Sequence, residues 1–535
     1  MDYGWWSLVP PLVAISLAII SRRVVASLLL GAAVGVLILK DWSADWNPFT
    51  ALAALCETHL WTSLSDPQHI RVFAFTSLMG AMIAVIQRCG GMQGVVDALV
   101  PLARTRRSGQ LLTWFLGLAI FFDDYANSLL LGTTMRPLTD RLRISREKLA
   151  YLVDSTAAPV AGLAFISTWI AGEIGYIEMG FESLDLPTGT VDGFSVFVAT
   201  IPYRFYVILA LLFVPMVALS ERDFGPMFTA ESRALNRDNV TADRRGGAVQ
   251  ETVGQTPSRW LNAVVPILVT LVITACLLLL TGYRTIGDQL TGDGGWRLLA
   301  RIFGAGDSYL ALVYGSLAGL LAAILLARVQ KILSFAQARA VALHGATLML
   351  PALIILWLAW TLSGITGKDF LGTGQFLGSQ LQHAIDLRWM PTIVFVLSSL
   401  VAFSTGTSWG TMGILMPIVV DTTYRMIQAQ TGTGDPYGPL LTASVGSVLA
   451  GAIFGDHCSP ISDTTVLSSQ ASGCNHVEHV RTQLPYALLV ASVSIALGTL
   501  PAGFGISPWP LLATALTALL LLLLALGRRT DCSRP

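Results

Sequence analysis

The sequence has little charge, and it lacks the patterns of a soluble enzyme. Charged residues make up only 12% of the 535 residues, about half of the roughly 25% found in soluble domains. The formal net charge is zero, which argues against a nucleic-acid partner. The glycine-rich stretches do not match a P-loop, and no Ser/His/Asp combination resembles a nucleophile elbow. The sequence therefore predicts neither an enzyme nor a nucleic-acid-binding protein.

Cysteine is also scarce. The six cysteines are Cys56, Cys89, Cys276, Cys458, Cys474 and Cys532, and they are scattered without metal-ligand spacing. A disulfide framework is not expected. His476 and His479 stand three residues apart, which metal ligation on a helix allows. Because no further ligands accompany them, a solvated loop is the favoured interpretation.

Long hydrophobic runs dominate the chain. Hydrophobic residues make up 53% and the mean hydropathy is +0.65. Segments of roughly 17–25 residues, long enough to cross a bilayer, recur from Trp5 to Leu526. The prediction is an all-α polytopic protein of the lipid bilayer with about 11 transmembrane helices. We expect full spans at 5–20, 24–39, 70–87, 149–172, 194–219, 260–280, 308–327, 343–362, 439–470, 484–503 and 509–527.

Two further apolar regions are each divided by a polar cluster. The region 109–139 contains DDYAN at 123–127, and the region 389–420 contains STGTS at 404–408. An arm of about twelve residues is roughly 18 Å long, slightly more than half the hydrocarbon core. Both regions are therefore predicted to be re-entrant hairpins whose tips reach mid-depth.

Basic residues set the predicted orientation. Most Lys and Arg fall on one side if the N-terminus lies outside and the C-terminus is cytoplasmic. This arrangement requires 109–139 to be re-entrant, because basic clusters flank it on both sides. The loop 173–193 carries only acids and is placed outside. The polar segment 221–259 is balanced in charge, and we expect a flexible cytoplasmic linker there.

The two halves of the chain resemble each other. FDDYANSLLLGTTMRPLTD (122–140) precedes DSTAAPVAG (154–162), and FSTGTSWGTMGILMPIVVD (403–421) precedes DHCSPISD (456–463). Each half has an odd number of predicted spans, so the second half should be inverted relative to the first. The predicted organisation is a first inverted repeat at 1–220, with hairpin 109–139 and broken helix 149–172; the linker 221–259; a second inverted repeat at 260–505, with hairpin 389–420 and broken helix 439–470; and an extra helix with the tail at 506–535.

Four polar clusters interrupt these apolar runs. Irregular backbone at membrane depth lines a cavity or lies inside protein, and intramembrane carboxylates are functional by default. The clusters are rich in oxygen and contain no basic side chain, which favours cations or protons as ligands. The candidate binding residues are Asp123, Asp124, Asn127, Asp154, Ser155, Thr156, Ser404, Thr405, Thr407, Ser408, Asp456, His457, Ser459, Asp463 and Thr464.

Each residue type also has a structural interpretation. Ser and Thr in membrane helices commonly bond to their own backbone. Asp123 and Asp124 are adjacent, so only one of them is expected to face the site. His457 is either a proton acceptor or a hydrogen-bonded neighbour, whereas for Arg204 a structural role is favoured.

The segments FDDYANSLLLGTTMRPLTD, DSTAAPVAG, STGTSWGTMGILMP and GDHCSPISDTT resemble signature segments of the NhaC family of bacterial sodium/proton antiporters. The resemblance covers about residues 70 to 500 of the chain. It implies a multi-pass secondary transporter of the bacterial cytoplasmic (inner) membrane, with inverted repeats, re-entrant hairpins and no tightly bound cofactor. It also implies a homodimer. Relatives of similar sequence exchange organic acids or amino acids, so the resemblance leaves the substrate open.

The leading hypothesis is sodium/proton antiport by competition at intramembrane carboxylates. Burial favours the protonated carboxyl, whereas a bound cation favours the charged form. The sodium ligands are proposed among Asp154, Asp456 and Asp463, with Asp154 and Asp456 acting together. The alternative is sodium- or proton-coupled transport or exchange of a small organic solute (an amino acid, amine or carboxylate). A channel or receptor fits less well, because inverted broken segments suit alternating access.

Overall fold

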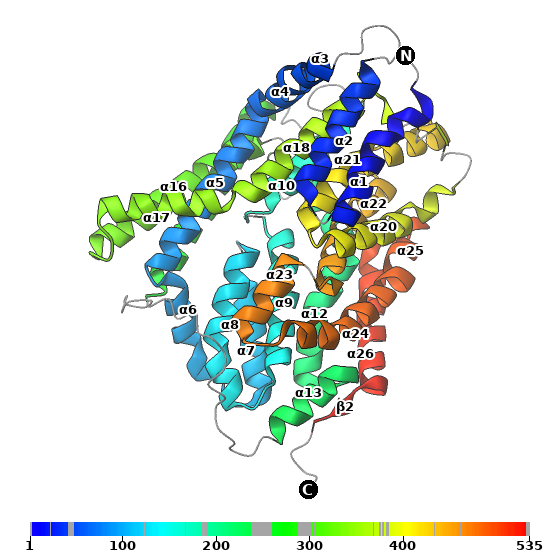
Figure 1. Cartoon of the computed structure of the whole chain (residues 1–535). Helices are drawn as coiled ribbons and strands as arrows, with labels where there is room; N and C mark the ends of the chain where they lie inside the picture. The colour runs from blue at the N-terminus through cyan, green and yellow to red at the C-terminus, as the bar shows by residue number, and fades with distance from the viewer. Residues whose placement is uncertain are drawn as a thin grey trace.

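The chain folds into a bundle of helices, several of which break near its centre (Figure 1). The computed structural model describes residues 3–21, 23–40, 48–121, 123–165, 167–184, 186, 191–236, 259–286, 302, 306–367, 369–373, 376, 379–380, 385–432, 434–460 and 462–530. The α-helices are α1 (Val9–Ser21), α2 (Val24–Leu39), α3 (Pro48–Ala53), α4 (Trp61–Ser65), α5 (Pro67–Arg88), α6 (Gly91–Leu99), α7 (Arg106–Ala119), α8 (Asp124–Arg141), α9 (Arg146–Leu163), α10 (Ile170–Glu182), α11 (Gly193–Thr200), α12 (Phe205–Ser220), α13 (Gly225–Leu235), α14 (Leu261–Ile286), α16 (Ser308–Val329), α17 (Phe335–Leu348), α18 (Leu350–Thr366), α20 (Met390–Thr405), α21 (Ser408–Thr431), α22 (Pro439–Cys458), α23 (Asp463–Ser472), α24 (His476–Ser494), α25 (Leu500–Gly503) and α26 (Pro508–Leu526). Short 3₁₀ or π turns extend or join them at Gly4–Leu8, Ala54–Leu60, Val100–Leu102, Ile201–Tyr203, Leu387–Trp389 and Ile495–Thr499.

The number of membrane spans differs from the prediction. In the described part of the chain, eight helices are long and apolar enough to cross a membrane, or nine if the bent pair Gly193–Tyr203 and Phe205–Ser220 forms one span. The sequence predicts about eleven. The apolar stretches Gly4–Leu17 and Val25–Leu39 are helical but shorter than a full crossing. The structure therefore supports a multi-pass membrane protein with fewer full spans than expected.

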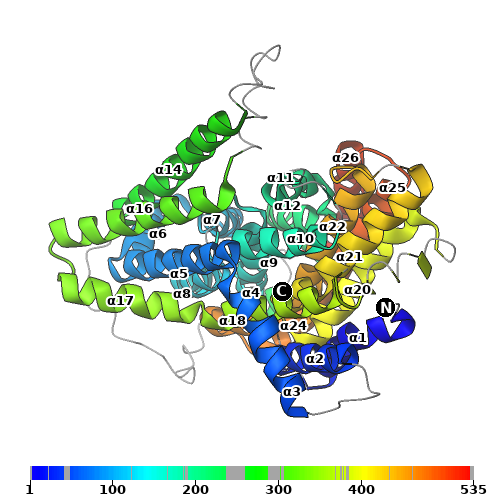
Figure 2. The same ribbon diagram turned by 90° about the horizontal axis from the view of Figure 1, so that it is seen from above.

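One group of helices lies to the side of the rest. Figures 1 and 2 agree in placing α5, α6, α16 and α17 together, and α14, labelled in Figure 2, packs against α16 and α6. Small residues allow close backbone contact within this group. A Cβ at Gly345 of α17, for example, would lie 2.4 Å from the Gly80 carbonyl oxygen of α5.

The polar clusters mark the points where the central helices break. α7 and α8 are joined through residues 120–123, and α20 and α21 through residues 406–407. α9 is separated from α10 by residues 164–169, and α22 from α23 by residues 459–462. The helices therefore break in the segments where the sequence predicts breaks, and the re-entrant course of the two hairpins stays a prediction.

The predicted acidic loop 173–193 is largely wrong, because residues 170–182 form α10. Glu173 and Glu178 point inward instead of into water. The Glu173 carboxylate lies 2.9 Å from the Arg204 guanidinium, and both side chains are buried. Glu178 accepts a hydrogen bond from the Tyr309 hydroxyl. A helix can hold these acids because each has a partner inside the protein.

The second segment of each broken helix packs against the other half of the chain. α23 packs against α8 and α9 of the first half, and α10 packs against α21 of the second half. At the first contact, a Cβ on Gly132 would lie 2.5 Å from the Ala471 Cβ; at the second, a Cβ on Gly180 would lie 2.4 Å from the Val420 Cβ. The centre of the molecule is therefore built from both halves.

The first part of the expected linker is ordered. β1 (Arg222–Asp223) pairs antiparallel with β2 (Arg528–Arg529), and α13 packs against α9 and α24. The prediction of a flexible segment is wrong here, because Met227, Ala230 and Leu235 of α13 are buried. The rest of the linker, 237–258, lies outside the described residues.

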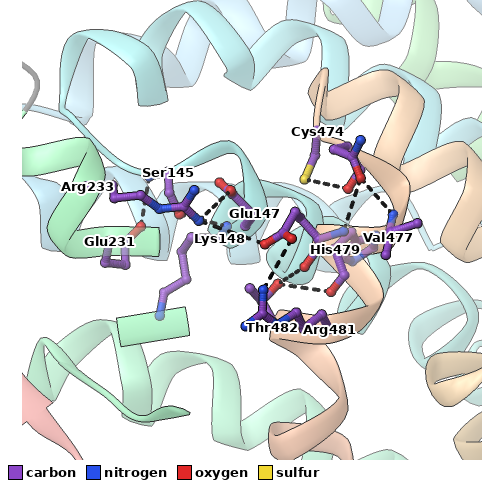
Figure 3. Close-up of polar contacts among 12 residues, drawn as sticks. Ser145, Glu147, Lys148, Glu231, Arg233, Cys474, Val477, His479, Arg481 and Thr482 are labelled. Atoms are coloured by element: carbon purple, nitrogen blue, oxygen red, sulfur yellow. Dashed lines mark hydrogen bonds and ion pairs between the residues drawn. The ribbon is translucent and has the colours of Figure 1, made fainter. Parts of the chain in front are cut away.

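Ion pairs fix α13 against the helix ends beside it. Glu231 pairs with Arg106 and accepts a hydrogen bond from the Ser145 amide at 2.8 Å. Burial raises the pKa of the Glu231 carboxyl, and the charge of Asp223 adds to this effect. Arg233 bridges Glu147 at 3.4 Å and Glu478 at 3.9 Å. Figure 3 shows these groups where α9, α13 and α24 meet.

Candidate functional site

Asp154 is a meeting point of the two halves of the chain. It lies on α9 and is fully buried. Its Oδ2 atom accepts hydrogen bonds from Thr465 Oγ1 at 3.1 Å and from Gln483 Nε2 at 2.5 Å, and its Oδ1 accepts from Ser468 Oγ at 3.2 Å. The three donors belong to α23 and α24. Three neutral donors can stabilise a carboxylate anion at this depth.

Asp456 lies two residues before the end of α22 and is also buried. Its Oδ2 accepts hydrogen bonds from the Ser408 amide at 3.2 Å and from the Ser408 hydroxyl. Ser408 begins α21, so the carboxylate sits at the positive end of that helix. Thr465 Oγ1 is 3.1 Å from the Asp456 carbonyl oxygen as well as from Asp154. Asp154 is therefore linked to the Asp456 backbone through one hydroxyl, while the two carboxylates bind different donors.

His457 is a buried neighbour of this centre. Its Nδ1 lies 2.9 Å from the Tyr206 hydroxyl of α12, and its carbonyl oxygen accepts from Gln483 Nε2 at 3.0 Å. Its Nε2 has no hydrogen-bond partner among the described residues. The ring also lies within hydrogen-bonding reach of the Asp154 backbone.

The other two aspartates lie at the tip of the first hairpin. Thr168, in the break between α9 and α10, donates to Asp123 Oδ2 at 3.1 Å. The neighbouring Trp169 side chain hydrogen-bonds to Asp124. Trp169 also meets Trp409 edge to face, with ring centroids 5.8 Å apart, and Trp409 follows Ser408 of the second hairpin. Trp169 thus connects the tips of both hairpins.

Several predicted site residues hold the breaks in place. Asn127 Nδ2 donates to the carbonyls of Gly117, Ile120 and Thr156, although its Oδ1 has no partner among the described residues. The Thr156 hydroxyl donates to the Leu152 carbonyl, and the Ser459 hydroxyl donates to the Phe403 carbonyl. The hydroxyls of Thr464 and Ser462 hydrogen-bond to each other. The Thr407 hydroxyl accepts a hydrogen bond from the Gly410 amide. Ser155 is buried and Ser404 half-buried. The side chains of Thr405 and Asp463 lie outside the described set.

Thr465 ends the predicted segment GDHCSPISDTT, whereas Ser468 and Gln483, which also complete the site, are absent from the predicted residues. Among the described residues, Thr465, Ser468 and Gln483 donate the side-chain hydrogen bonds to the Asp154 carboxylate. Thr465 and Ser468 are three residues apart and share a face of α23. That spacing, and an amide in an otherwise apolar run, are the signals available in the sequence.

Arg204 has the structural role that the sequence favours. Its guanidinium pairs with Glu173 of α10 and donates to the Gly162 carbonyl near the end of α9. The Arg204 charge is buried with its partner and bridges the break between α9 and α10.

A cavity opens beside the first hairpin. It has a volume of about 520 Å³ and lies between α5, α8, α17 and α23. Apolar side chains form most of its wall. The residues with polar side-chain groups in the wall are Gln87, Asp123, Tyr125 and Gln470.

Comparisons with known proteins agree with this architecture. The model of the Na+/H+ antiporter family matches residues 160–504. An uncharacterized protein of Haemophilus influenzae is 34% identical over 524 residues, covering 98% of this chain and 96% of that protein. A malate-2H(+)/Na(+)-lactate antiporter of Bacillus subtilis is 38% identical over 109 residues, 20% of this chain and 21% of the relative. The structure of the YdaH transporter of Alcanivorax borkumensis is similar in fold, with a TM-score of 0.57 and 14% identity, and covers 91% of this chain and 99% of that one.

Proposed function

Because this chain belongs to the Na+/H+ antiporter family, we propose that it exchanges sodium ions for protons at Asp154 and Asp456. The observation that carries the proposal is the position of Asp154. Its carboxylate lies on α9 of the first half, while its donors come from α23 and α24 of the second half. A movement between these elements would make or break the site, as alternating access requires.

Oxygen atoms for a sodium ion surround this carboxylate. Thr465 Oγ1 and Ser468 Oγ are within hydrogen-bond distance of Asp154, and the Asp456 carbonyl oxygen lies 3.1 Å from Thr465 Oγ1. When a cation binds, each hydroxyl can turn its proton away and offer a lone pair. Protonation of Asp154 removes the countercharge, so a proton and a cation exclude each other there. Asp456 supplies the second carboxylate and Asp463 a further ligand.

The test uses everted membrane vesicles that hold a preformed pH gradient. A sodium pulse should collapse the gradient in the wild type, and Asp154→Asn and Asp456→Asn should abolish this response. Asp140→Asn is the control, since Asp140 is half-exposed and pairs with Arg146 at 3.6 Å. The proposal fails if sodium, lithium and potassium give no response from mildly acidic to alkaline pH, or if Asp154→Asn retains coupled exchange.

A second candidate function is coupled transport of a small organic solute, such as an amino acid, amine or carboxylate. The cavity of about 520 Å³ favours it, because small-molecule sites are commonly pockets of roughly 300–1,000 Å³ with a few polar groups. A relative over part of the chain is named a malate-2H(+)/Na(+)-lactate antiporter. Sodium-driven uptake of a labelled solute by proteoliposomes, lost in Gln470→Leu, would support this function.

The orientation, the repeats and the assembly are proposed with the function. The N-terminus outside and the C-terminus cytoplasmic, in a bacterial inner membrane, agree with the gathering of Arg106, Glu147, Glu231 and Arg233 on one face. The inverted repeats 1–220 and 260–505 agree with the reciprocal packing of α10 and α23. The homodimer follows from the family resemblance alone.

A further inference from the structure

The cavity of about 520 Å³ lies where the side group of helices meets the centre of the bundle. α5 and α17 pack against each other on one side of it, and α8 and α23 pack against each other on the other side (Figure 1). Gly80 lies near the middle of the candidate span His69–Arg88, and Met349 near the middle of Phe335–Thr366. Both residues line the cavity, which therefore lies at the depth of the hydrocarbon core.

The rim of the cavity is apolar and exposed. Leu129 of α8 is 45% exposed, Leu348 of α17 is 56% exposed, and both line the cavity. Tyr125, one turn before Leu129 on α8, is also exposed. Because Leu348 lies well inside a candidate span, the surface around it faces lipid chains and not water. The cavity thus opens sideways, toward the bilayer.

The charge in the wall is negative. Among the described residues that line the cavity, Asp123 is the charged one, and it is buried. Its Oδ2 accepts a hydrogen bond from the Thr168 hydroxyl at 3.1 Å. The amides of Gln87 and Gln470 are neutral and can both donate and accept hydrogen bonds. A carboxylate ligand would meet a like charge here without a basic partner, whereas an ammonium group would meet its countercharge.

We propose that this cavity binds an amphipathic organic cation, a protonated amine with an apolar body, which enters from the bilayer. The ammonium group pairs with Asp123, the apolar body packs against Ile83 and Leu467, and the entrance lies between Leu129 and Leu348. This inference rests on the second candidate function, coupled transport of a small organic solute. It selects the amine among the three solute classes of that function and disfavours the carboxylate.

α23 forms the wall between the cavity and the candidate ion site. Val466, Leu467 and Gln470 line the cavity, whereas Thr465 and Ser468 donate to Asp154. Successive residues of an α-helix are turned by about 100°, so these two sets lie on opposite faces of α23. A ligand in the cavity therefore contacts the helix that positions the hydroxyls of the ion site. Binding at the two sites is coupled if the ligand shifts this helix.

The opposite face of α23 is held by α9 and α24. The Ser469 hydroxyl of α23 donates to the Thr465 carbonyl at 2.7 Å and lies 2.8 Å from His479 Nδ1 of α24. His479 is fully buried, so the predicted solvated loop is wrong for this residue. The cavity is therefore the side on which α23 has room to move.

The first test compares three ligands that share one aromatic ring and differ in charge: 2-phenylethylamine, 2-phenylethanol and phenylacetate. Binding is measured by equilibrium dialysis of the full-length protein in lipid nanodiscs, with empty nanodiscs subtracted. The amine should bind at least about ten-fold tighter than the alcohol, and phenylacetate should bind most weakly. Asp123→Asn should remove the preference for the amine. Equal binding of the three ligands, or an unchanged preference in Asp123→Asn, would overturn the inference.

Two further variants keep the test decisive if Asp123→Asn does not fold. Gln470 is exposed at the cavity wall, so its replacement leaves the buried packing intact. Gln470→Glu should strengthen amine binding several-fold, and Gln470→Lys should weaken it by a similar factor. The control is Asp97→Asn, because Asp97 is an exposed acid of α6 that accepts a hydrogen bond from Gln93 at 2.8 Å. Identical amine affinities in the two Gln470 variants would contradict a ligand ammonium in this cavity.

The sideways opening has its own measurement. A spin label on Leu348→Cys, in a background without the native cysteines, should collide more often with dissolved oxygen than with a water-soluble nickel complex. The control is a label on Cys56 alone, which is exposed in the turn Ala54–Leu60 and should favour the nickel complex. More frequent collisions with nickel at position 348 would show that the cavity opens to water.

Uptake by proteoliposomes separates this inference from the function on which it rests. Sodium-driven uptake of labelled 2-phenylethylamine would support both. Amine binding without sodium-driven uptake would support the inferred site and contradict coupled transport of its ligand. Sodium-driven uptake of a carboxylate by a protein that does not bind the amine would support the second candidate function and overturn the inference.

Discussion

At the scale of single residues, Ser408 makes two hydrogen bonds to the Asp456 carboxylate. The Ser408 amide and hydroxyl both donate to the Asp456 Oδ2 atom, and Ser408 is the first residue of α21. The helix end and the hydroxyl together hold the carboxylate in one orientation. A hydrogen bond to a charged group is worth about 1.5–3 kcal/mol, more than most neutral hydrogen bonds. Ser408 therefore sets both the direction and the charge stability of this side chain.

We expect Ser408→Ala to weaken apparent sodium affinity about ten-fold, which corresponds to about 1.4 kcal/mol. The backbone amide remains, so the carboxylate loses only the Ser408 hydroxyl as a donor and the fold is retained. The measurement is the sodium concentration that gives half-maximal collapse of the pH gradient in everted vesicles.

The matched control is Ser399→Ala on the preceding arm. Ser399 is buried and donates to the Phe395 carbonyl of its own helix. Its loss should leave sodium affinity unchanged. Equal affinity in Ser408→Ala and wild type would show that Asp456 does not bind the ion.

At the scale of helices, the site depends on how closely α23 approaches α8. Gly132 provides this approach: a Cβ there would lie 2.5 Å from the Ala471 Cβ and 3.0 Å from the Ser472 amide nitrogen. The same helix carries Thr465 and Ser468, the hydroxyl donors to Asp154. Any side chain at 132 must push α23 away, and the two donors move with it.

Gly132→Ala should therefore lower both stability and exchange. Overpacking of this kind commonly costs about 1–3 kcal/mol, which should appear as a lower midpoint of thermal unfolding in detergent. Gly364→Ala is the control, because a Cβ at that glycine meets nothing within 4 Å. If both variants unfold at the wild-type temperature, the close contact between α8 and α23 is absent in the native protein.

The sequence predicts the places where helices break, because acids and hydroxyls stand out in apolar runs. It does not predict which partners they find. Asp154 and Asp456 align in the two halves, yet Asp154 lies well inside α9 and Asp456 lies two residues from the end of α22. α23 brings them together by packing across to the other half. Such a contact leaves no local pattern in the sequence.

The buried polar partners of acids and histidines could not be predicted from the sequence either. Glu173 and Glu178 resemble a solvated acidic loop in composition, because composition carries no trace of Arg204 and Tyr309. His479 resembles a loop residue for the same reason, although Ser469 and Gln483 bind it inside the protein. In each case a partner distant in the sequence hydrogen-bonds to the buried polar group, which lowers the free-energy cost of burying it.

At the scale of the whole molecule, ion pairs join loops that are predicted to lie on the same face. Arg107 pairs with Glu221 at 2.9 Å, and both segments are predicted to be cytoplasmic. Arg71 pairs with Asp307 at 3.0 Å, and both are predicted to lie outside. Both pairs agree with the same assignment. Which face is cytoplasmic stays a prediction from the basic residues.

Cysteine labelling can decide the orientation. Cys56 is exposed in the turn Ala54–Leu60, which is predicted to lie outside. Cys89 and Cys458 are buried, and Cys276 lies on the membrane span α14. In a Cys532→Ser background, a membrane-impermeant maleimide should label Cys56 in intact cells and not in everted vesicles. Labelling of Cys56 only in everted vesicles would reverse the orientation.

Cys474 provides the counterpart on the opposite face, with a distinct pH dependence. Burial raises the pKa of its thiol to about 12, and the charges of Glu147 and Glu478 add to this effect. Because the thiolate is the reactive form, the thiolate fraction at pH 8 should be roughly a thousand-fold below that of a free thiol. In everted vesicles Cys474 should therefore react slowly at pH 8, and its rate should rise about ten-fold for each pH unit above that. Reaction at the rate of a free thiol would show that α13 and the start of α24 do not cover Cys474.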